Sequence, residues 1–355
     1  MRVTLPPFSR RDALKAGTAV VASALATRVV SAAPPPAAVT PALIEAARRE
    51  GKVVFYTAMD LSVAERMGKA FEAKYPGVSV RVERTGSERL FQRIAQEYGS
   101  RIHAVDVIDT SDASHVLAWK RSGWLEPFVP EDVARHFPPE HRDPDGMFAT
   151  ARALLCVIGY NTNLVKAEDA PKSYADLLDP KWAGKIVKAH PGFSGTIMTA
   201  TFQIARELGW EYFEKLAKQR VMQVQSSTDP PKKLALGERA VMADGPDYGV
   251  VLQKEAGNPV EVVYPAEGAP MITCPEALFR NAPNPNAARL FLSFVFSAEG
   301  QQVISDVAQR SLHPNVTVKP GRTPLSAIKV MRDDPAGVEA AAEEIKARYS
   351  KLFRV

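Results

Sequence analysis

Short apolar runs alternate with amphipathic segments of helical length along most of this chain. The run 53–56 predicts a strand, and Ser62, with Glu65 three residues later, predicts a capping box at the start of the next helix. Apolar and polar residues alternate over 78–82 as in a half-buried strand, and Ser87 begins another helix. Strands separated by helices of roughly 10–15 residues predict βαβ units on a largely parallel sheet.

The same alternation returns in the second half of the chain, with a helix over 195–208 whose apolar residues share one face. Beyond its N-terminal segment the chain keeps about 320 residues, which is too long for one ordinary core and suits two α/β domains. The remaining predicted strands are 105–108, 154–160, 186–189, 240–243, 260–264 and 271–279, and the remaining predicted helices begin at Asp112 and Asp229 or cover 287–296, 299–307 and 336–349.

The N-terminus carries an export signal rather than folded structure. A twin-arginine motif covers 9–15, an apolar, alanine-rich stretch covers 16–26, and 30–32 offers the small residues that a signal peptidase needs. We therefore expect a twin-arginine signal peptide at 1–33 and a flexible, proline-rich tether at 34–41. The expected partner in export is the twin-arginine machinery, and the expected location is the periplasm.

Much of the positive charge of the chain lies in this signal peptide. Its removal lowers the count of Lys and Arg from 45 to 40 and that of Asp and Glu from 40 to 39, so the net charge falls from +5 to +1. The mature chain therefore gives no reason to expect nucleic acid as a partner. It has no apolar run long enough to span a membrane and no lipid-attachment cysteine, so we expect a freely diffusing monomer. The two cysteines, Cys156 and Cys274, can form one disulfide or remain two buried thiols.

Ligands of open α/β sheets bind beyond the carboxyl ends of strands, where helices begin. The run Ser194-Gly195-Thr196 is the most specific of these loops, because free amides and the helix dipole attract an anion there; the alternative is that Ser194 is a simple N-cap. Arg84 can add a bidentate contact to a carboxylate or phosphate, or end its strand in solvent. The candidate ligand-binding residues are Thr57, Ala58, Met59, Asp60, Arg84, Thr85, Thr110, Ser111, Ser194, Gly195, Thr196, Asp229, Asp247 and Tyr248.

The sequence offers little support for catalysis. The run 192–196 is similar to a nucleophile elbow, but Thr196 replaces the closing glycine. The six histidines include no close metal-binding pair such as His-Glu-x-x-His, and no glycine-rich nucleotide loop is present. We therefore expect a binding protein that is not an enzyme and that has no cofactor or resident metal.

A set of short motifs occurs in one order along the chain, at 52–56, 71–78, 104–107, 159–163, 179–185, 193–196, 264–268, 281–285 and 297–301. In these motifs and their order, the chain resembles an extracellular solute-binding protein of an ABC importer. The resemblance is to the group that includes the ferric-ion-binding periplasmic proteins, and it covers about residues 42–320.

The resemblance implies a type 2 periplasmic binding fold, in which two α/β lobes are joined by two crossing strands near 155–160 and 269–278. Cys156 and Cys274 would then lie on neighbouring strands, so a hinge disulfide is possible. The implied partners are an ABC permease and its ATPase, although a sensor protein would be served by the same fold. The implied bounds are 42–154 with 271–325 for lobe 1, 155–270 for lobe 2, and 326–355 for a C-terminal helical segment.

The ferric members of this group bind iron through a histidine, a glutamate and a pair of tyrosines. On this sequence those positions fall at or near Asp60, near Ser111 and on Asp247-Tyr248, so only Tyr248 is retained. We therefore expect a small organic anion in the cleft, such as a phosphonate, a sugar phosphate or a carboxylate. The alternative is a ferric-ion-binding protein whose oxygen ligands are Asp60, Asp247 and Tyr248.

Overall fold

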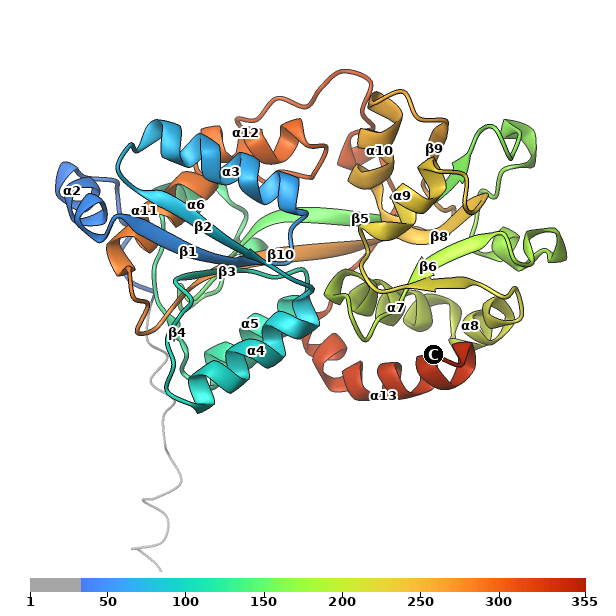
Figure 1. Ribbon diagram of the computed structural model, residues 1–355, viewed down its shortest axis with the longest axis horizontal. Coiled ribbons are helices and arrows are strands. Elements are labelled where there is room, and N and C mark those ends of the chain that lie inside the picture. Colours follow the sequence, from blue (N-terminus) through green and yellow to red (C-terminus); the bar gives the residue numbers. More distant parts are fainter. Residues whose placement is uncertain (1–32) are drawn as a thin grey trace, which may run out of the picture. The chain divides into compact units, whose positions relative to one another are not determined.

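The computed structural model describes residues 33–355 of the chain. Apart from Ala33, the predicted signal peptide lies outside these residues. Figure 1 shows helices on both sides of a sheet whose strands follow the order β2-β1-β3-β10-β5-β8-β6-β7. Strands β4 and β11 pair with β10, and β9 pairs with β5, which gives eleven strands in the described part of the chain. The predicted α/β class is therefore confirmed.

The N-terminal half of the sheet is parallel, because β1 pairs in parallel with β2 on one side and with β3 on the other. Helix α3 begins after Asp60, whose carboxylate accepts a hydrogen bond from Ser62 N. The predicted capping box of Ser62 and Glu65 is therefore wrong, because Asp60 caps the helix two residues earlier. The elements are α2 (Pro41–Glu50), β1 (Lys52–Thr57), α3 (Leu61–Lys74), β2 (Ser79–Arg84), α4 (Ser87–Gly99), β3 (Val107–Asp109), α5 (Ala113–Arg121), β4 (Leu125–Glu126) and α6 (Glu131–His136).

Two long strands, β5 (Ala149–Asn161) and β10 (Ala269–Phe279), lie side by side in the middle of the sheet and are antiparallel. β10 is also antiparallel to β3, and β5 is antiparallel to β8 and β9. The prediction of a largely parallel sheet is therefore wrong for its centre. The physical reason is that the chain crosses between the two halves of the sheet twice, in opposite directions (Figure 1).

The other half of the sheet is again parallel, with β6 between β7 and β8. β6 and α7 occupy the predicted ranges 186–189 and 195–208. The C-terminal helix α13 packs against α5, α7 and α8, so it contacts helices from both halves (Figure 1). The elements are β6 (Ile186–Ala189), α7 (Gly195–Leu208), α8 (Trp210–Ala217), β7 (Met222–Val224), α9 (Asp229–Ala235), β8 (Val241–Pro246), α10 (Asp247–Glu255), β9 (Val260–Val263), α11 (Pro285–Phe296), α12 (Ala298–Asp306), β11 (Val330–Met331) and α13 (Pro335–Phe353).

Each half of the sheet has its own hydrophobic core. In the first half, Phe291 of α11 packs against Phe55 of β1 and Phe71 of α3, with ring centroids 5.0 and 5.2 Å apart. In the second half, Phe213 of α8 and Tyr349 of α13 belong to a separate buried cluster. Separate hydrophobic clusters in the two halves, connected by two crossing strands, are the arrangement expected of a protein whose halves move as units.

The segment 34–41 does not form the predicted flexible tether. Ala37 N donates to Val129 O at 2.9 Å, and Glu131 N donates to Ala37 O at 3.1 Å. Ala37 thereby forms a parallel bridge with Pro130. The proline-rich composition is compatible with this edge position, because an extended edge segment needs few backbone donors.

The two cysteines are free and fully buried on neighbouring strands. In the register of β5 and β10, Leu155 lies opposite Met271 and Arg152 lies opposite Cys274, so Cys156 is four positions away from the residue facing Cys274. At about 3.3 Å per residue this offset is about 13 Å, whereas a disulfide needs Cα atoms within about 7 Å of each other. The hinge disulfide that the resemblance made possible is therefore wrong, because the sequence does not reveal the register of the strands.

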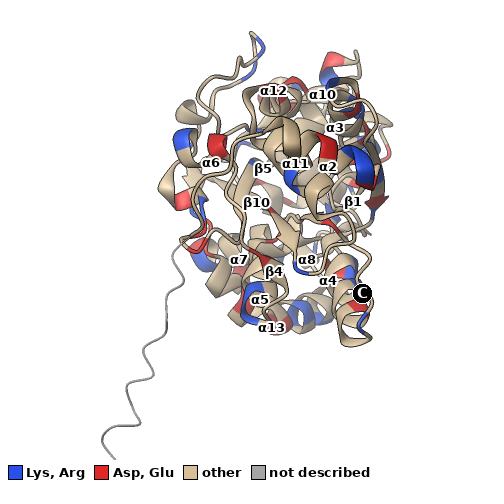
Figure 2. Ribbon diagram, turned by 90° about the vertical axis from the view of Figure 1, so that its left-hand side faces the viewer, with Lys and Arg blue, Asp and Glu red and all other residues tan. Residues whose placement is uncertain are grey.

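Figure 2 shows Lys and Arg intermixed with Asp and Glu on the helices of one side, rather than gathered in a patch of one sign. This distribution agrees with the net charge of +1 that remains when residues 1–33 are left out of the count. Among the residues that the structure describes, no helix combines the length and the apolar character needed to cross a bilayer.

Candidate ligand-binding site

A cavity of about 420 Å³ lies where loops from both halves of the sheet meet. The first half contributes residues that follow the carboxyl ends of β1, β2 and β3, and the second half contributes the loops that lead into α7 and α9. Six predicted residues line the cavity, namely Ala58, Arg84, Thr85, Ser111, Ser194 and Asp229. The other lining residues are Gly86, Ser87, Arg89, Phe193, Gln225, Ser226 and Ser227.

Ser194 occupies the N-cap position of α7, but its hydroxyl makes no capping hydrogen bond. Met198 N is the first amide of this helix that donates to a backbone carbonyl, that of Ser194. The preceding amides, those of Gly195, Thr196 and Ile197, therefore lack an intrahelical acceptor, as at any helix start. The simple capping role considered for Ser194 is not realised, and its hydroxyl remains available to the cavity.

Helix α4 begins at the same cavity. Its N-cap is Gly86, which has no side chain to satisfy the first amides, and its first residue is Ser87. Ser87 Oγ lies 2.6 Å from Ser111 Oγ, so two hydroxyls from neighbouring loops meet beside this helix start. Two helix N-termini without side-chain caps thus converge on one cavity, which favours an anion there.

Two arginines add positive charge to the cavity and connect its two sides. Arg84 donates from Nε to Met59 O at 3.1 Å and from Nη2 to Ser226 Oγ at 3.3 Å. A guanidinium has five N–H groups, so three remain for a ligand. Arg89 donates from Nη2 to Gln225 Oε1 at 2.9 Å. Asp229 is the one carboxylate among the lining residues, and it accepts a hydrogen bond from Ser226 N.

Several predicted residues lie in the same loops but do not line the cavity. Thr57 is fully buried, and its hydroxyl is engaged by Asp109 and Met59. The hydroxyl of Thr110 contacts Asp112 N and His115 Nδ1. The remaining residues of this kind are Met59, Gly195 and Thr196, which are buried, and Asp60, which caps α3.

Asp247 and Tyr248 also lie outside the cavity lining. Asp247 Oδ2 is 2.6 Å from Arg310 Nη2, and Asp247 Oδ1 accepts a hydrogen bond from Tyr248 N. Burial raises the pKa of the Asp247 carboxyl, and the Arg310 charge opposes this effect. Burial also raises the pKa of Tyr248, which keeps its phenol protonated. Asp247 is therefore part of a buried ion pair, whereas the Tyr248 phenol lies near the charges of Asp60 and Arg84.

Sequence reasoning identified the loops that carry Gly86, Ser87, Phe193, Ser226 and Ser227 but did not select these residues. Arg89 and Gln225 were missed altogether. Arg89 carries a usable signal, because a cation in the first turn of a helix opposes the helix dipole and suggests an anionic partner. Gln225 has no comparable signal, since its place depends on how the two halves of the sheet meet.

A buried charged cluster adjoins the cavity at the start of α4 and α5. His115 Nε2 lies 3.2 Å from Glu88 Oε1 and 3.8 Å from Asp112 Oδ2, and Lys346 of α13 lies 3.0 Å from Glu88 Oε2. Burial lowers the pKa of His115, but the charges of Asp112 and Glu88 outweigh it and raise the pKa overall. The cluster is satisfied internally and attaches α13 to the helix whose N-terminus faces the cavity.

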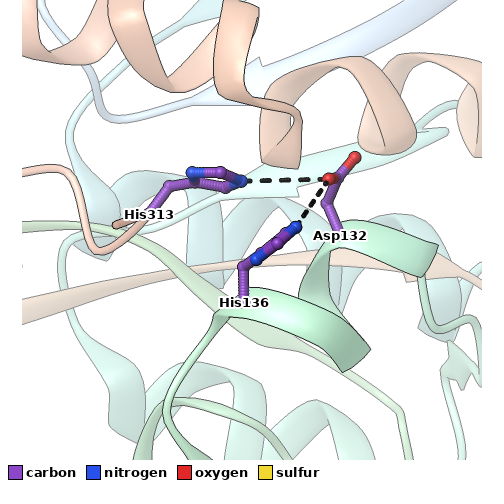
Figure 3. A group of neighbouring side chains, drawn as sticks. All are labelled: Asp132, His136 and His313. Carbon is purple, nitrogen blue, oxygen red and sulfur yellow. Dashed lines mark ion pairs between the residues drawn. The ribbon is translucent and has the colours of Figure 1, made fainter. Parts of the chain in front are cut away.

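A second cluster joins residues that are far apart in the sequence (Figure 3). His136 Nε2 and His313 Nε2 each lie 3.8 Å from Asp132 Oδ1, and the two imidazole centroids are 4.7 Å apart. The fold brings His136 and His313 together although they are far apart in the sequence, where no His-Glu-x-x-His motif occurs. Asn315 N donates to His313 Nδ1 at 3.1 Å. A neutral His313 consequently carries its proton on Nε2, the atom that faces Asp132, and does not offer a metal-binding lone pair there.

A family model described as "Bacterial extracellular solute-binding protein" matches residues 104–324, and the chain belongs to this family. It is a periplasmic solute-binding protein of the ABC importer class. The predicted membership and location are therefore confirmed, and a small-molecule ligand and a permease partner follow from the class.

Individual proteins show the same relationship. "Iron uptake protein A1" of Synechocystis is 24% identical over 315 residues, which cover 84% of this chain and 85% of that protein. The periplasmic binding protein AfuA from Actinobacillus pleuropneumoniae, solved with exogenous fructose-6-phosphate bound, has a TM-score of 0.78 at 24% identity and covers 86% of this chain and 99% of its own. Iron-bound HitA from Pseudomonas aeruginosa has a TM-score of 0.72 at 23% identity, and the match covers 84% of this chain and 99% of that chain. These likenesses confirm the predicted two-lobed fold.

Proposed function

We propose that this protein captures a small organic anion, such as a phosphonate, sugar phosphate or carboxylate, in the cavity and delivers it unchanged to an ABC permease. One observation carries the proposal, namely the convergence of two helix N-termini without side-chain caps and two arginines on a single cavity. Backbone amides at helix starts and guanidinium groups are the usual partners of phosphate and carboxylate oxygens.

The remainder of the cavity suits the organic part of such a solute. Ser226, Ser227 and Asp229 line the side opposite α4 and can exchange hydrogen bonds with hydroxyl or ammonium groups. A cavity of about 420 Å³ falls within the usual range for small-molecule sites. A solute with an anionic end and a polar end would use both sides of the cavity.

Contacts across the cavity support capture by closure of the two lobes. Arg84 reaches Ser226, and Arg89 reaches Gln225, each from one half of the sheet to the other. A solute that contacts both sides would favour this closed arrangement, as in other hinge-bending binding proteins. We place the lobe boundaries at the predicted crossings, with 42–154 and 271–325 in one lobe and 155–270 in the other.

Ferric ion is the second candidate, and the likeness to iron-bound HitA favours it. The oxygen donors would be Asp60, Asp247 and Tyr248. To serve as a ligand, Asp247 would have to give up its contact with Arg310 at 2.6 Å. The organic anion requires no such rearrangement, which is why it is preferred here.

The test is native mass spectrometry with metal analysis on protein purified from periplasm without refolding, followed by calorimetric titration with fructose 6-phosphate, 2-aminoethylphosphonate and citrate. We expect an organic adduct, and at least tenfold weaker binding after Arg84→Ala or Ser194→Ala. Arg81→Ala is the matched control, because Arg81 lies on the same strand and is exposed. Stoichiometric iron with no organic adduct would instead establish the ferric alternative.

A further inference from the structure

We propose that Thr57 is a positioning residue for Arg84 rather than a ligand-binding residue. The inference rests on the proposed anion-binding role of Arg84. A chain of hydrogen bonds begins at a buried arginine on the crossing strand β5, passes through the Thr57 hydroxyl, and ends at the Arg84 guanidinium. Its members are Arg152, Asp109, Thr57, Met59 and Arg84.

The first part of this chain of hydrogen bonds is a buried charge pair. Arg152 Nη2 lies 2.8 Å from both carboxylate oxygens of Asp109, and both side chains are almost fully buried. Asp109 is the last residue of β3 and lies beside Thr57 in the register of β1 and β3. The Thr57 hydroxyl donates to Asp109 Oδ2 at 2.8 Å. The hydroxyl has a single hydrogen, so this bond fixes its orientation.

The second part of this chain of hydrogen bonds connects the Thr57 hydroxyl to the cavity. Because its hydrogen is directed to Asp109, the Thr57 oxygen is free to accept from Met59 N, at 2.9 Å. Met59 O then accepts from Arg84 Nε at 3.1 Å. The Nε contact aims the guanidinium, since it sets the plane in which the remaining N–H groups of Arg84 lie. Thr57 therefore acts on the cavity through Met59 and has no need to touch the solute.

The effect of removing the hydroxyl should be local. The loop is also held by backbone bonds, from Ala58 N to Asp109 O and from Thr85 N to Thr57 O, each at 3.2 Å. These bonds do not depend on the Thr57 side chain. Removing the Thr57 hydroxyl should therefore leave the Met59 amide without its acceptor and the Arg84 guanidinium less well oriented. The strands should stay paired.

Glu276 of β10 provides a control in the same cluster. It lies opposite Asp109 in the register, and among the described residues neither of its carboxyl oxygens has a hydrogen-bond partner. Burial, reinforced by the Asp109 charge, raises the pKa of Glu276 well above its usual range. Glu276 makes none of the hydrogen bonds that lead from Arg152 to Arg84, so Glu276→Gln should leave Arg84 undisturbed.

The experiment compares Thr57→Val, Thr57→Ser and Glu276→Gln, each with and without Arg84→Ala. One readout is the calorimetric affinity for fructose 6-phosphate, and the other is the Arg84 Nε–H signal in the ¹⁵N spectrum of the solute-free protein, assigned by its loss in Arg84→Ala. We expect Thr57→Val to weaken binding about threefold to tenfold and to speed exchange of the Nε proton. Thr57→Ser should restore both, and Glu276→Gln should change neither.

In the Arg84→Ala background, Thr57→Val should cost no further affinity, because two residues acting through one contact are not additive. A full additional loss, or an unchanged Nε–H signal in Thr57→Val, would overturn the positioning role. Arg84→Ala without any effect on binding would overturn the proposed function instead. In that case the Nε–H signal still decides whether Thr57 orients Arg84.

Discussion

Gly195, the first residue of α7, lies directly against Asp112, the N-cap of α5, where the two halves of the sheet meet. A Cβ atom added to Gly195 would come within 2.6 Å of Asp112 Cβ and 3.0 Å of Ser87 Cβ. Real Cβ atoms do not approach this closely, so the contact requires the absence of a side chain at residue 195. Glycine is needed here for close approach between elements rather than for a special backbone conformation.

Gly195→Ala should therefore hold the two lobes apart. We expect solute affinity to fall about tenfold or more, because overpacking a tight contact costs about 1–3 kcal/mol, while the thermal stability of the solute-free protein changes little. Calorimetric titration and thermal unfolding on the same preparation check both points. Gly99→Ala is the control, since a Cβ there meets nothing within 4 Å. Undiminished affinity in Gly195→Ala would show that this contact is not part of the solute-bound state.

Both cysteines should behave as unreactive thiols. Burial raises the pKa of Cys274 to about 12 and raises the pKa of Cys156 well above its usual range, so the native protein contains almost no thiolate. We expect a thiol reagent to label neither residue in the folded protein and both in denaturant. Reductant should leave the melting temperature unchanged. A mass two daltons lower before reduction would contradict the register described for β5 and β10.

His190 should make the protein sensitive to acid. Burial and the Lys188 charge lower its pKa to about 4, and its Nδ1 accepts a hydrogen bond from Gly192 N at 2.9 Å. In the unfolded chain the same group titrates near its ordinary value of about 6.5. As the pH falls from about 6.5 towards 4, the unfolded state gains a proton that the folded state does not, so stability decreases over that window.

The loss should reach about 2 kcal/mol at pH 4.5, from the difference between the two pKa values. Urea unfolding of the native chain and of His190→Gln at pH 7 and pH 4.5 measures it. The variant should lose less stability than the native chain between the two pH values. Equal losses would mean that His190 is not the group responsible.

Local signals account for the parts of the fold that the sequence predicted well. The β6 and α7 boundaries follow from an apolar run and from a serine–glycine pair before an amphipathic segment, all within 25 residues. The cap of α3 was misplaced because Asp60 and Ser62 both suit an N-cap, and sequence alone does not rank them. Such errors of two residues are decided by competition between neighbouring side chains.

Non-local pairing accounts for the parts that sequence reasoning missed. The offset between Cys156 and Cys274, the contact of Arg89 with Gln225, and the pairing of His136 with His313 each join segments that are far apart in the chain. Their geometry depends on strand register and on how the two halves meet, neither of which leaves a periodic signal. The hydroxyl of Thr57 illustrates a further limit. The sequence placed Thr57 in the loop after a strand, whereas it is the last residue of β1, and only its contacts reveal that its hydroxyl faces inward.

The place of β10 between β3 and β5 has a consequence for biosynthesis. Residues 107–109 and 149–161 both pair with a strand that the ribosome makes only after nearly all of the second half of the sheet. Until then each of these strands presents an unpaired edge, which is the kind of surface through which chains aggregate. Closing such long loops is also slow. Pairing at the centre of the sheet therefore has to wait until residue 279 has emerged from the ribosome, and a chaperone that covers the edges of β3 and β5 would protect these strands until then.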